Sequence, residues 1–301
     1  MADWDVVVIG GGAAGLTAAA AVACTGLSCL VIDRAGGGSE LMNLGPLHDC
    51  DEALTGPDLA ARLLEEAMIA GAELDIGEVT GLVPDAAGWR VSTDNGPHTA
   101  LTVILATGLA PGTLGLDGES DFEGRGLSHC ATCDGPLYRD QPVVVAGADR
   151  WAQQEARDLT AIASAVTLVS QQYDPPSGAE AFAVLRGRIV ALEGESGLEA
   201  VLVQLDDSSA PMRLPARVVF VQTARRPALA FAPETLARDA IGRVIADVNL
   251  QTNLPGLFVA GDVRAGASRT LAAAMADGRC TAASARAALP SLGSPLGKDA
   301  D

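Results

Sequence analysis

The stretch VVVIGGGAAGLTAAAAVA (residues 6–23) decides the fold of this chain. A β-branched run leads into a glycine-rich turn followed by small helix-forming residues, which predicts a strand, a tight turn and a helix. Gly10 allows the turn, Gly12 lets the backbone approach a pyrophosphate, and Gly15 lets helix and strand pack closely. The next apolar run ends at Asp33, where a carboxylate is expected to accept hydrogen bonds from a ribose diol. The pattern predicts a dinucleotide-binding unit.

A second strand, turn and helix are expected in VVVAGADRWAQQEARDL (residues 143–159). This stretch repeats the architecture of the first unit without repeating its sequence. At 301 residues the chain is long enough for two domains. The 34 glycines and the aromatic content of 3% favour an α/β protein with many tight turns.

Further elements follow from capping and turn signals. Thr55 is expected to start a helix whose apolar stripe consists of Leu59, Leu63, Leu64 and Met68. A hairpin is expected around residues 94–96, a buried strand within residues 252–263, and a closing helix over residues 269–288.

The charge of the chain limits its partners. The formal net charge is −18, and Lys298 is the only lysine, so nucleic acid and anionic membranes are not expected as partners. The amino terminus lacks the pattern of a secretion signal, and no apolar run approaches the roughly 20 residues of a membrane span. We therefore expect a cytoplasmic protein.

The stretch HCATCDG (residues 129–135) holds the chemistry-bearing cysteines, Cys130 and Cys133. Their spacing suits a metal site or a redox dithiol in a reducing compartment. A zinc site needs four ligands, and the chain offers no second pair at this spacing and only three scattered histidines. Redox chemistry is therefore the favoured interpretation. The other cysteines are expected to be buried and apolar: Cys24, Cys29, Cys50 and Cys280.

The chain resembles the low-molecular-weight thioredoxin reductases and their relatives along nearly its whole length. The matching stretches are GGGAAG, TGP, ATG, GRGLSHCATCDGPLYRDQ and TNLPGLFVAGDV. The resemblance implies an α/β flavoprotein with two dinucleotide-binding domains. The FAD domain would comprise residues 1–112 and 230–301, and a smaller NAD(P)-type domain carrying the dithiol would comprise residues 113–229. It also implies FAD as the cofactor and a homodimer.

The resemblance also assigns roles to residues. Cys133 would face the flavin, Cys130 would exchange with the substrate, and Asp134 would shuttle the proton. His129, beside Cys130, could stabilise its thiolate or act as a base. The residues expected to bind FAD are Gly10, Gly12, Ala13, Ala14, Gly15, Asp33, Arg34, Asn43, Ala106, Thr107, Gly108, Gly261, Asp262, Arg269 and Thr270; the family usually has Gln in place of Thr270.

The second glycine turn departs from the reductase pattern. Asp149 stands where a glycine should let the backbone touch the NADPH pyrophosphate, and its charge opposes phosphate. The next strand ends in Ser170-Gln171-Gln172, without the arginines that bind a 2′-phosphate. We therefore expect that NADPH does not bind productively.

These features predict an FAD-dependent dithiol oxidase, similar to the NADPH-independent enzymes of gliotoxin and holomycin type. A small-molecule dithiol would pass electrons through Cys130 and Cys133 to FAD and then to O2, which gives a disulfide and H2O2. Asn43 and His48 are similar to residues of that branch. One alternative is a thioredoxin-disulfide reductase fed by NADPH or another reduced donor, such as ferredoxin or a flavin. Another is a flavin-binding sensor with a vestigial dithiol.

Overall fold

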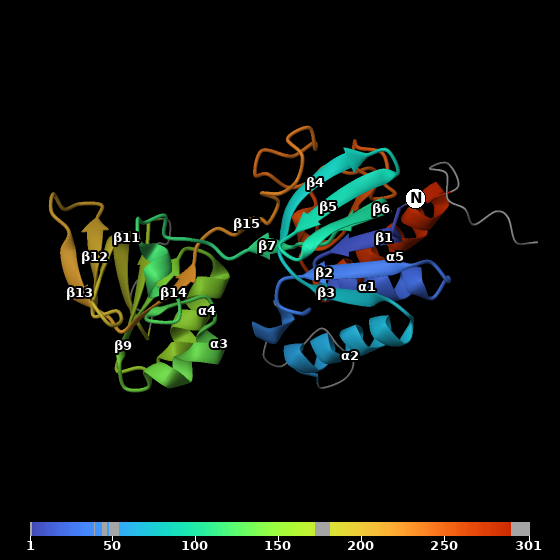
Figure 1. Ribbon diagram of the computed structural model, residues 1–301. Helices are drawn as coiled ribbons and strands as arrows, with labels where there is room; N and C mark the ends of the chain where they lie inside the picture. Colours follow the sequence, from blue (N-terminus) through green and yellow to red (C-terminus); the bar gives the residue numbers. More distant parts are fainter. Residues whose placement is uncertain (1, 39, 44–46, 48–53, 172–180, 290–301) are drawn as a thin grey trace, which may run out of the picture. The chain divides into compact units, whose positions relative to one another are not determined.

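The structure, a computed structural model, describes residues 2–38, 40–43, 47, 54–171 and 181–289. The chain divides into two compact units (Figure 1). Unit 1 comprises Met1–Leu109 and Arg226–Asp301, and unit 2 comprises Ala110–Arg225. The sequence placed these boundaries three and four residues further along the chain, after residue 112 and before residue 230. The first unit is therefore interrupted by the second.

Unit 1 is built on a mixed sheet. The strands β3, β2, β1, β6 and β16 are parallel and neighbours in this order, and the hairpin of β4 and β5 continues from β6 in antiparallel pairing. In chain order its elements are β1 (Trp4–Ile9), α1 (Ala13–Ala23), β2 (Cys29–Asp33), η1 (Leu41–Asn43), α2 (Gly56–Ile69), β3 (Glu73–Ile76), β4 (Val79–Asp85), β5 (Gly88–Thr93), β6 (Gly96–Leu105), β16 (Leu257–Val259), η4 (Gly261–Val263) and α5 (Leu271–Ala288).

Alternation along the strands gives this sheet two buried faces. One face, including Val6, Val8 and Ile104, packs against α1, α2 and α5. The opposite face, including Val7 and Leu105, packs against the β4–β5 hairpin and the segment from Leu229 to Val263. Both faces are covered, so the parallel strands read as continuous apolar runs.

Local signals explain two of the predicted elements. The hairpin is confirmed, because Thr93 of β5 pairs with Gly96 of β6. Thr55 caps α2 in a reciprocal capping box with Asp58, as its sequence position suggested. The predicted stripe is partly wrong: Leu59 and Leu63 are buried, but Met68 is 47% exposed. The next core position is Ala67, which lies on the face of Leu63 at a spacing of four residues.

Unit 2 also has a mixed sheet, in the order β13-β12-β11-β10-β9-β14-β8. A separate short ribbon pairs β7 (Leu109–Ala110) with β15 (Arg226–Pro227), where the chain passes from one unit to the other. The elements of unit 2 are η2 (Glu119–Phe122), β8 (Leu127–Ser128), α3 (Ala131–Asp134), η3 (Gly135–Tyr138), β9 (Pro142–Gly147), α4 (Arg150–Leu159), β10 (Ala165–Ser170), β11 (Ala183–Glu193), β12 (Ala200–Leu205), β13 (Met212–Pro215) and β14 (Val218–Gln222).

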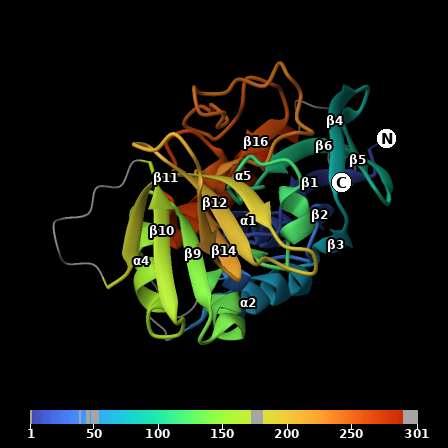
Figure 2. The same cartoon turned by 90° about the vertical axis from the view of Figure 1, so that its left-hand side faces the viewer.

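The two units repeat one arrangement. In unit 2 the parallel strands β11, β10, β9, β14 and β8 lie side by side, and α4 connects β9 to β10 as α1 connects β1 to β2 (Figure 2). Ala152, Ala156 and Leu159 of α4 pack on Val143, Val145 and Phe220. The sequence therefore identified the repeated strand, turn and helix correctly.

The cysteines outside the dithiol differ in burial. Cys29 in β2 is fully buried, and burial raises the pKa of its thiol to about 12. The prediction was wrong for Cys24 and Cys280, which are exposed, and Cys50 lies outside the described residues. Cys24 lies one residue beyond α1, past its buried face. In the described part of the chain, no helix is long and apolar enough to cross a membrane.

Replacing Ile104 by alanine tests the core of unit 1. Ile104 is fully buried and lies in register with Val8 on one side and Phe258 on the other. We expect Ile104→Ala to lower the free energy of unfolding by about 2–5 kcal/mol. The matched control is Ile69→Ala, at a side chain that is 79% exposed, with an expected change below about 0.5 kcal/mol. Denaturant unfolding measures both, and equal effects would contradict this packing.

Candidate functional site

Four loops of unit 1 converge at one edge of its sheet. Ile9 lies in register with Ile32 and with Leu105, and Leu105 lies in register with Val259. Parallel strands end at the same edge, so the residues that follow them are neighbours. These are Gly10, Asp33, Ala106 and Ala260, and Gly261 comes directly after Ala260. The predicted cofactor-binding residues at the ends of these strands are thus brought together.

The glycine turn has the predicted geometry. Gly10 has φ +104°, and a Cβ there would collide with the carbonyl of Ala106, while a Cβ on Gly15 would collide with the carbonyl of Gly10. Gly12 is the N-cap of α1, and no side chain of the described residues caps the helix there. A Cβ on Gly12 would meet open space. The first turn of α1, with Ala13 and Ala14, therefore suits an anionic ligand group.

Asp33 organises the loops at this edge. Its carboxylate accepts hydrogen bonds from the backbone N–H groups of Gly11 at 2.7 Å, Ala35 at 2.9 Å and Gly37 at 2.9 Å. A carboxylate has about four acceptor positions, so one is left for a ribose hydroxyl. Arg34 follows on the exposed side of the loop. The sequence analysis predicted that Asp33 accepts from a ribose diol, which stays a prediction, and did not foresee these three backbone donors.

The segment Ala106-Thr107-Gly108 contains a buried hydroxyl group without a hydrogen-bond partner among the described residues. This group is Thr107 Oγ1. Buried hydroxyls are nearly always satisfied, so a bound group at this edge fits the site. Asn43 ends η1 in the same unit, whereas His48 lies outside the described residues.

Asp277 of α5 fixes the corner at Gly261. Its carboxylate accepts the backbone N–H of Gly261 at 3.1 Å. It also accepts two hydrogen bonds from Arg264, from Nε at 2.6 Å and from Nη2 at 3.0 Å. A bidentate pair of this kind sets both position and orientation. Neither residue was predicted, because their pairing depends on how α5 packs.

Arg269 and Thr270 lie between this corner and α5. Arg269 Nε lies 3.6 Å from Asp262 Oδ2, and Arg269 has φ +55°. Thr270 Oγ1 accepts the backbone N–H of Ala273 at 3.3 Å and so caps α5. The helix predicted from Arg269 therefore begins at Leu271, because Thr270 serves as its cap.

In unit 2, Cys130 and Cys133 form a disulfide, with their Cα atoms 5.4 Å apart. Cys130 is buried and precedes the single turn of α3, while Cys133 is exposed. The backbone N–H of Cys133 donates to Cys130 Sγ at 3.1 Å. This N–H group therefore points at the sulfur of the first cysteine.

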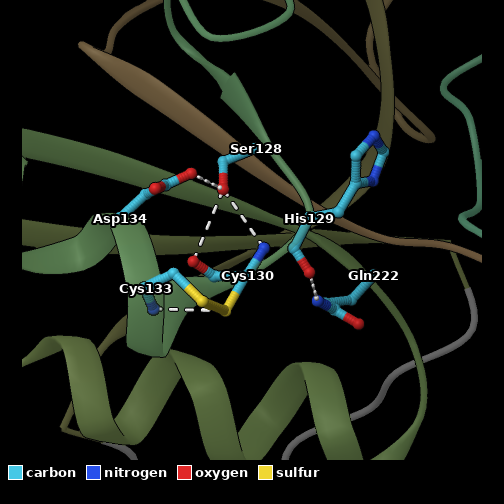
Figure 3. Close-up of a disulfide and its surroundings, with 6 residues drawn as sticks. All are labelled: Ser128, His129, Cys130, Cys133, Asp134 and Gln222. Carbon is cyan, nitrogen blue, oxygen red and sulfur yellow. Dashed lines mark hydrogen bonds between the residues drawn. A yellow bond between two sulfur atoms is a disulfide. The ribbon is translucent and has the colours of Figure 1, made fainter. Parts of the chain in front are cut away.

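Ser128 connects the disulfide to Asp134 (Figure 3). The Cys130 N–H donates to Ser128 Oγ at 3.1 Å, and Ser128 Oγ donates to Asp134 Oδ2 at 2.7 Å. The predicted proton carrier is therefore tied to the backbone of Cys130 through one hydroxyl. Sequence reasoning missed Ser128, although it lies two residues before the first cysteine.

The imidazole of His129 points away from the disulfide (Figure 3). Its Nε2 lies 3.1 Å from Glu123 Oε1, and Nδ1 is buried without a partner among the described residues. The backbone carbonyl of His129, by contrast, accepts from Gln222 Nε2 at 3.2 Å. In this structure His129 thus contributes its backbone to the surroundings of the disulfide, and its ring pairs with a carboxylate.

Glu155 of α4 is a second acid close to the dithiol that the sequence did not single out. Its carboxyl group interacts with the backbone N–H of Ala131 and with Gln222. Burial outweighs these contacts and raises its pKa to about 7. No three His, Cys, Asp or Glu side chains of the described ranges are grouped as metal ligands.

The second glycine turn differs from the first at its helix. Asp149 Oδ1 accepts the backbone N–H of Ala152 at 3.0 Å, so a carboxylate occupies the N-terminal turn of α4. Ser170 ends β10 and is buried, and Gln172 lies outside the described residues. The sequence overlooked Arg186, which lies on β11 in register with Ser170.

Known proteins of similar sequence indicate the family of this chain. The family model for pyridine nucleotide-disulphide oxidoreductases matches residues 4–278, so the chain belongs to this family of enzymes. It is 32% identical to a thioredoxin reductase of Treponema pallidum over 304 residues, covering 96% of this chain and 98% of the relative.

Solved structures show the same fold. Thioredoxin reductase of Lactococcus lactis in its FR conformation matches with a TM-score of 0.84 and 26% identity, covering 96% of this chain and all of that one. A ferredoxin-flavin thioredoxin reductase of Clostridium acetobutylicum matches with a TM-score of 0.54 and 27% identity, covering 96% and 98%. The chain is thus a disulfide oxidoreductase with the thioredoxin reductase fold. The names of these relatives favour the reductase alternative over the dithiol oxidase.

Removing the Asp277 carboxylate tests the corner at Gly261. Asp277→Ala leaves the partly buried Arg264 guanidinium and the Gly261 N–H without their acceptor, and we expect a loss of about 3 kcal/mol in unfolding free energy. The control is Glu193→Ala, which breaks the exposed pair with Arg213 and should change stability by at most about 1 kcal/mol. Denaturant unfolding compares them, and similar losses would contradict the positioning role of Asp277.

Proposed function

We propose that this protein binds FAD in unit 1 and uses Cys130 and Cys133 to reduce the disulfide of a thioredoxin-like protein. The observation that carries the proposal is the Cys130–Cys133 disulfide with its hydrogen-bonded Ser128 and Asp134. The names of the matched relatives support the same direction of electron flow. The predicted homodimer and cytoplasmic location stay predictions.

The edge of unit 1 supports FAD as the cofactor. The uncapped turn at Gly12 suits the pyrophosphate, the remaining acceptor of Asp33 suits a ribose hydroxyl, and Thr107 Oγ1 lacks a partner among the described residues. Asp262, Arg269 and the other residues predicted for this role would complete the site. FAD, when bound, supplies the two electrons that reopen the disulfide.

The dithiol chemistry falls to four residues. The Cys130 thiolate attacks the partner disulfide, which forms a mixed disulfide and releases a partner thiolate that takes up a proton from solvent. Cys133 then loses its proton and attacks the mixed disulfide, which restores the Cys130–Cys133 bond and releases the second partner thiol. Asp134, held by Ser128, carries the proton between Cys133 and the departing sulfur. Two thiols are oxidised and one disulfide is reduced.

The electron donor in this proposal is not NADPH bound at the second glycine turn. Asp149 already satisfies the N-terminal turn of α4 and adds a negative charge where a pyrophosphate would lie. At the corresponding turn of α1, Gly12 has no side chain. One matched relative is named for ferredoxin and flavin, which makes a donor of that kind a reasonable candidate.

Asp149 also supports a second candidate, the dithiol oxidase. If no reduced donor reaches the flavin through unit 2, a small dithiol can deliver the electrons instead. Two thiols are then oxidised to a disulfide, and O2 takes the two electrons and two protons as H2O2. The two candidates use the same cysteines and differ in the direction of electron flow.

Anaerobic titration with NADPH tests the donor assignment. We expect no bleaching of the flavin within seconds, whereas dithionite bleaches it fully, because Asp149 opposes pyrophosphate binding. Asp149→Gly should speed NADPH bleaching at least about tenfold, which corresponds to about 1.4 kcal/mol. The assignment would be contradicted if NADPH bleached the unaltered protein rapidly. If this bleaching were lost in Arg186→Ala, Arg186 would be identified as the phosphate ligand.

Assays with dithionite-reduced protein test the function itself. A thioredoxin disulfide should be reduced by the unaltered protein and not by Cys130→Ser or Cys133→Ser. Asp134→Asn should slow turnover by about 10²–10⁴-fold, and Asp140→Asn, an exposed acid nearby, is the control. Oxygen uptake and peroxide with a small dithiol, without thioredoxin reduction, would favour the oxidase instead.

A further inference from the structure

Glu155 is a carboxyl group in an apolar setting beside the dithiol. It lies on α4 between Ala152 and Ala156, both fully buried, and α4 packs against α3. Its Oε2 atom is buried and has no hydrogen-bond partner among the described residues. Acids are rarely buried without a charged partner unless they can become neutral.

The charges around Glu155 are few. Arg225 favours the ionised carboxylate and Asp158 disfavours it, and both effects are smaller than that of burial. The neighbouring strands β9 and β10, PVVVAG and AVTLVS, carry no ionisable side chain. On the side of α3 lie Cys130, Cys133 and Asp134. The pKa of about 7 therefore leaves Glu155 easily protonated near neutral pH.

The hydrogen bonds of Glu155 connect it to the dithiol. Ala131, whose N–H interacts with the Glu155 carboxyl, follows Cys130 directly. Gln222 interacts with the same carboxyl and donates to the carbonyl of His129, on the other side of Cys130. A negative charge on Cys130 therefore arises next to the backbone that Glu155 contacts, and a like charge disfavours the ionised carboxylate.

We propose that Glu155 takes up a proton each time the Cys130–Cys133 disulfide is reduced and releases it each time the disulfide re-forms. Two electrons, from the flavin in turnover, break the sulfur–sulfur bond. Cys133 Sγ takes one proton, Cys130 Sγ stays a thiolate, and the second proton goes to the Glu155 carboxylate. Oxidation reverses each transfer. This inference deepens the proposed function and rests on its dithiol cycle.

Glu155 acts in this scheme through the backbone around Cys130, so it is a positioning residue rather than a catalytic one. Its proton offsets the charge of the thiolate, which keeps the net charge around the dithiol unchanged on reduction. Asp134 serves a different step, because it is bound to Ser128 and carries the proton exchanged with the partner.

A redox titration of the full protein tests the proposal. The protein is equilibrated with reduced and oxidised dithiothreitol from pH 6 to 9, and the fraction of reduced Cys130–Cys133 is measured by alkylation and mass spectrometry of their peptide. The variants are Glu155→Gln and, as a control, Glu195→Gln, which neutralises an exposed acid of the same unit that does not act on Glu155. The pH dependence of dithiothreitol cancels when variants are compared.

At each pH, the equilibrium constant for reduction of the disulfide in the unaltered protein is divided by the same constant in Glu155→Gln. This ratio should fall at least about threefold between about pH 6.5 and 8.5, because the unaltered protein binds one more proton on reduction. Glu195→Gln should follow the unaltered protein. A constant ratio with reversible reduction overturns this proposal alone. A disulfide that no thiol can reduce overturns the proposed function as well.

Infrared difference spectroscopy decides the matter if Glu155→Gln does not fold. Reduction of the unaltered protein should produce the carbonyl band of a protonated carboxyl group, and the more conservative Glu155→Asp should shift that band. Absence of such a band on reduction overturns the proposal.

Discussion

The first-turn N–H groups of a helix must find acceptors, and the two units meet this requirement in different ways. In unit 1 the turn before α1 ends in Gly12, which has no side chain to cap the helix, so its first-turn N–H groups are open to another acceptor. In unit 2 the turn before α4 carries Asp149, whose carboxylate accepts from Ala152. The strand-turn-helix-strand crossover is shared by both units, so the side chain at this turn is a local difference between two otherwise similar helix starts.

The surroundings of the dithiol show why a short motif needs a folded scaffold. Ser128 comes from β8, Gln222 from the end of β14 and Glu155 from α4. These elements meet because β14 lies between β8 and β9 in the sheet. Two acids near the dithiol thus have different partners: Asp134 accepts from the Ser128 hydroxyl, and Glu155 interacts with the Ala131 N–H and with Gln222.

The sequence was sufficient for features that depend on local chemistry. The glycine turn at residues 10–15, the capping box at Thr55 and the hairpin at residues 94–96 were all predicted, because turn and cap residues act within a few positions. Contacts made between distant segments were not: Asp277 with Arg264, Glu155 with Ala131, and Arg186 beside Ser170. The predicted burial of Cys24 and Met68 was also wrong, because a shift of one residue along or around a helix separates a core position from a surface position.

The interruption of unit 1 by unit 2 has a consequence for synthesis of the chain. Unit 2 is continuous, so all of its strands have left the ribosome once residue 225 has emerged. In unit 1, β6 pairs with β16 and α1 packs against α5, and both partners are synthesised more than 140 residues later in the chain. At a translation rate of about 5–20 residues per second, the apolar face of α1 stays without α5 for about 12–50 s. The nascent amino-terminal segment is therefore the part of the protein most exposed to chaperones.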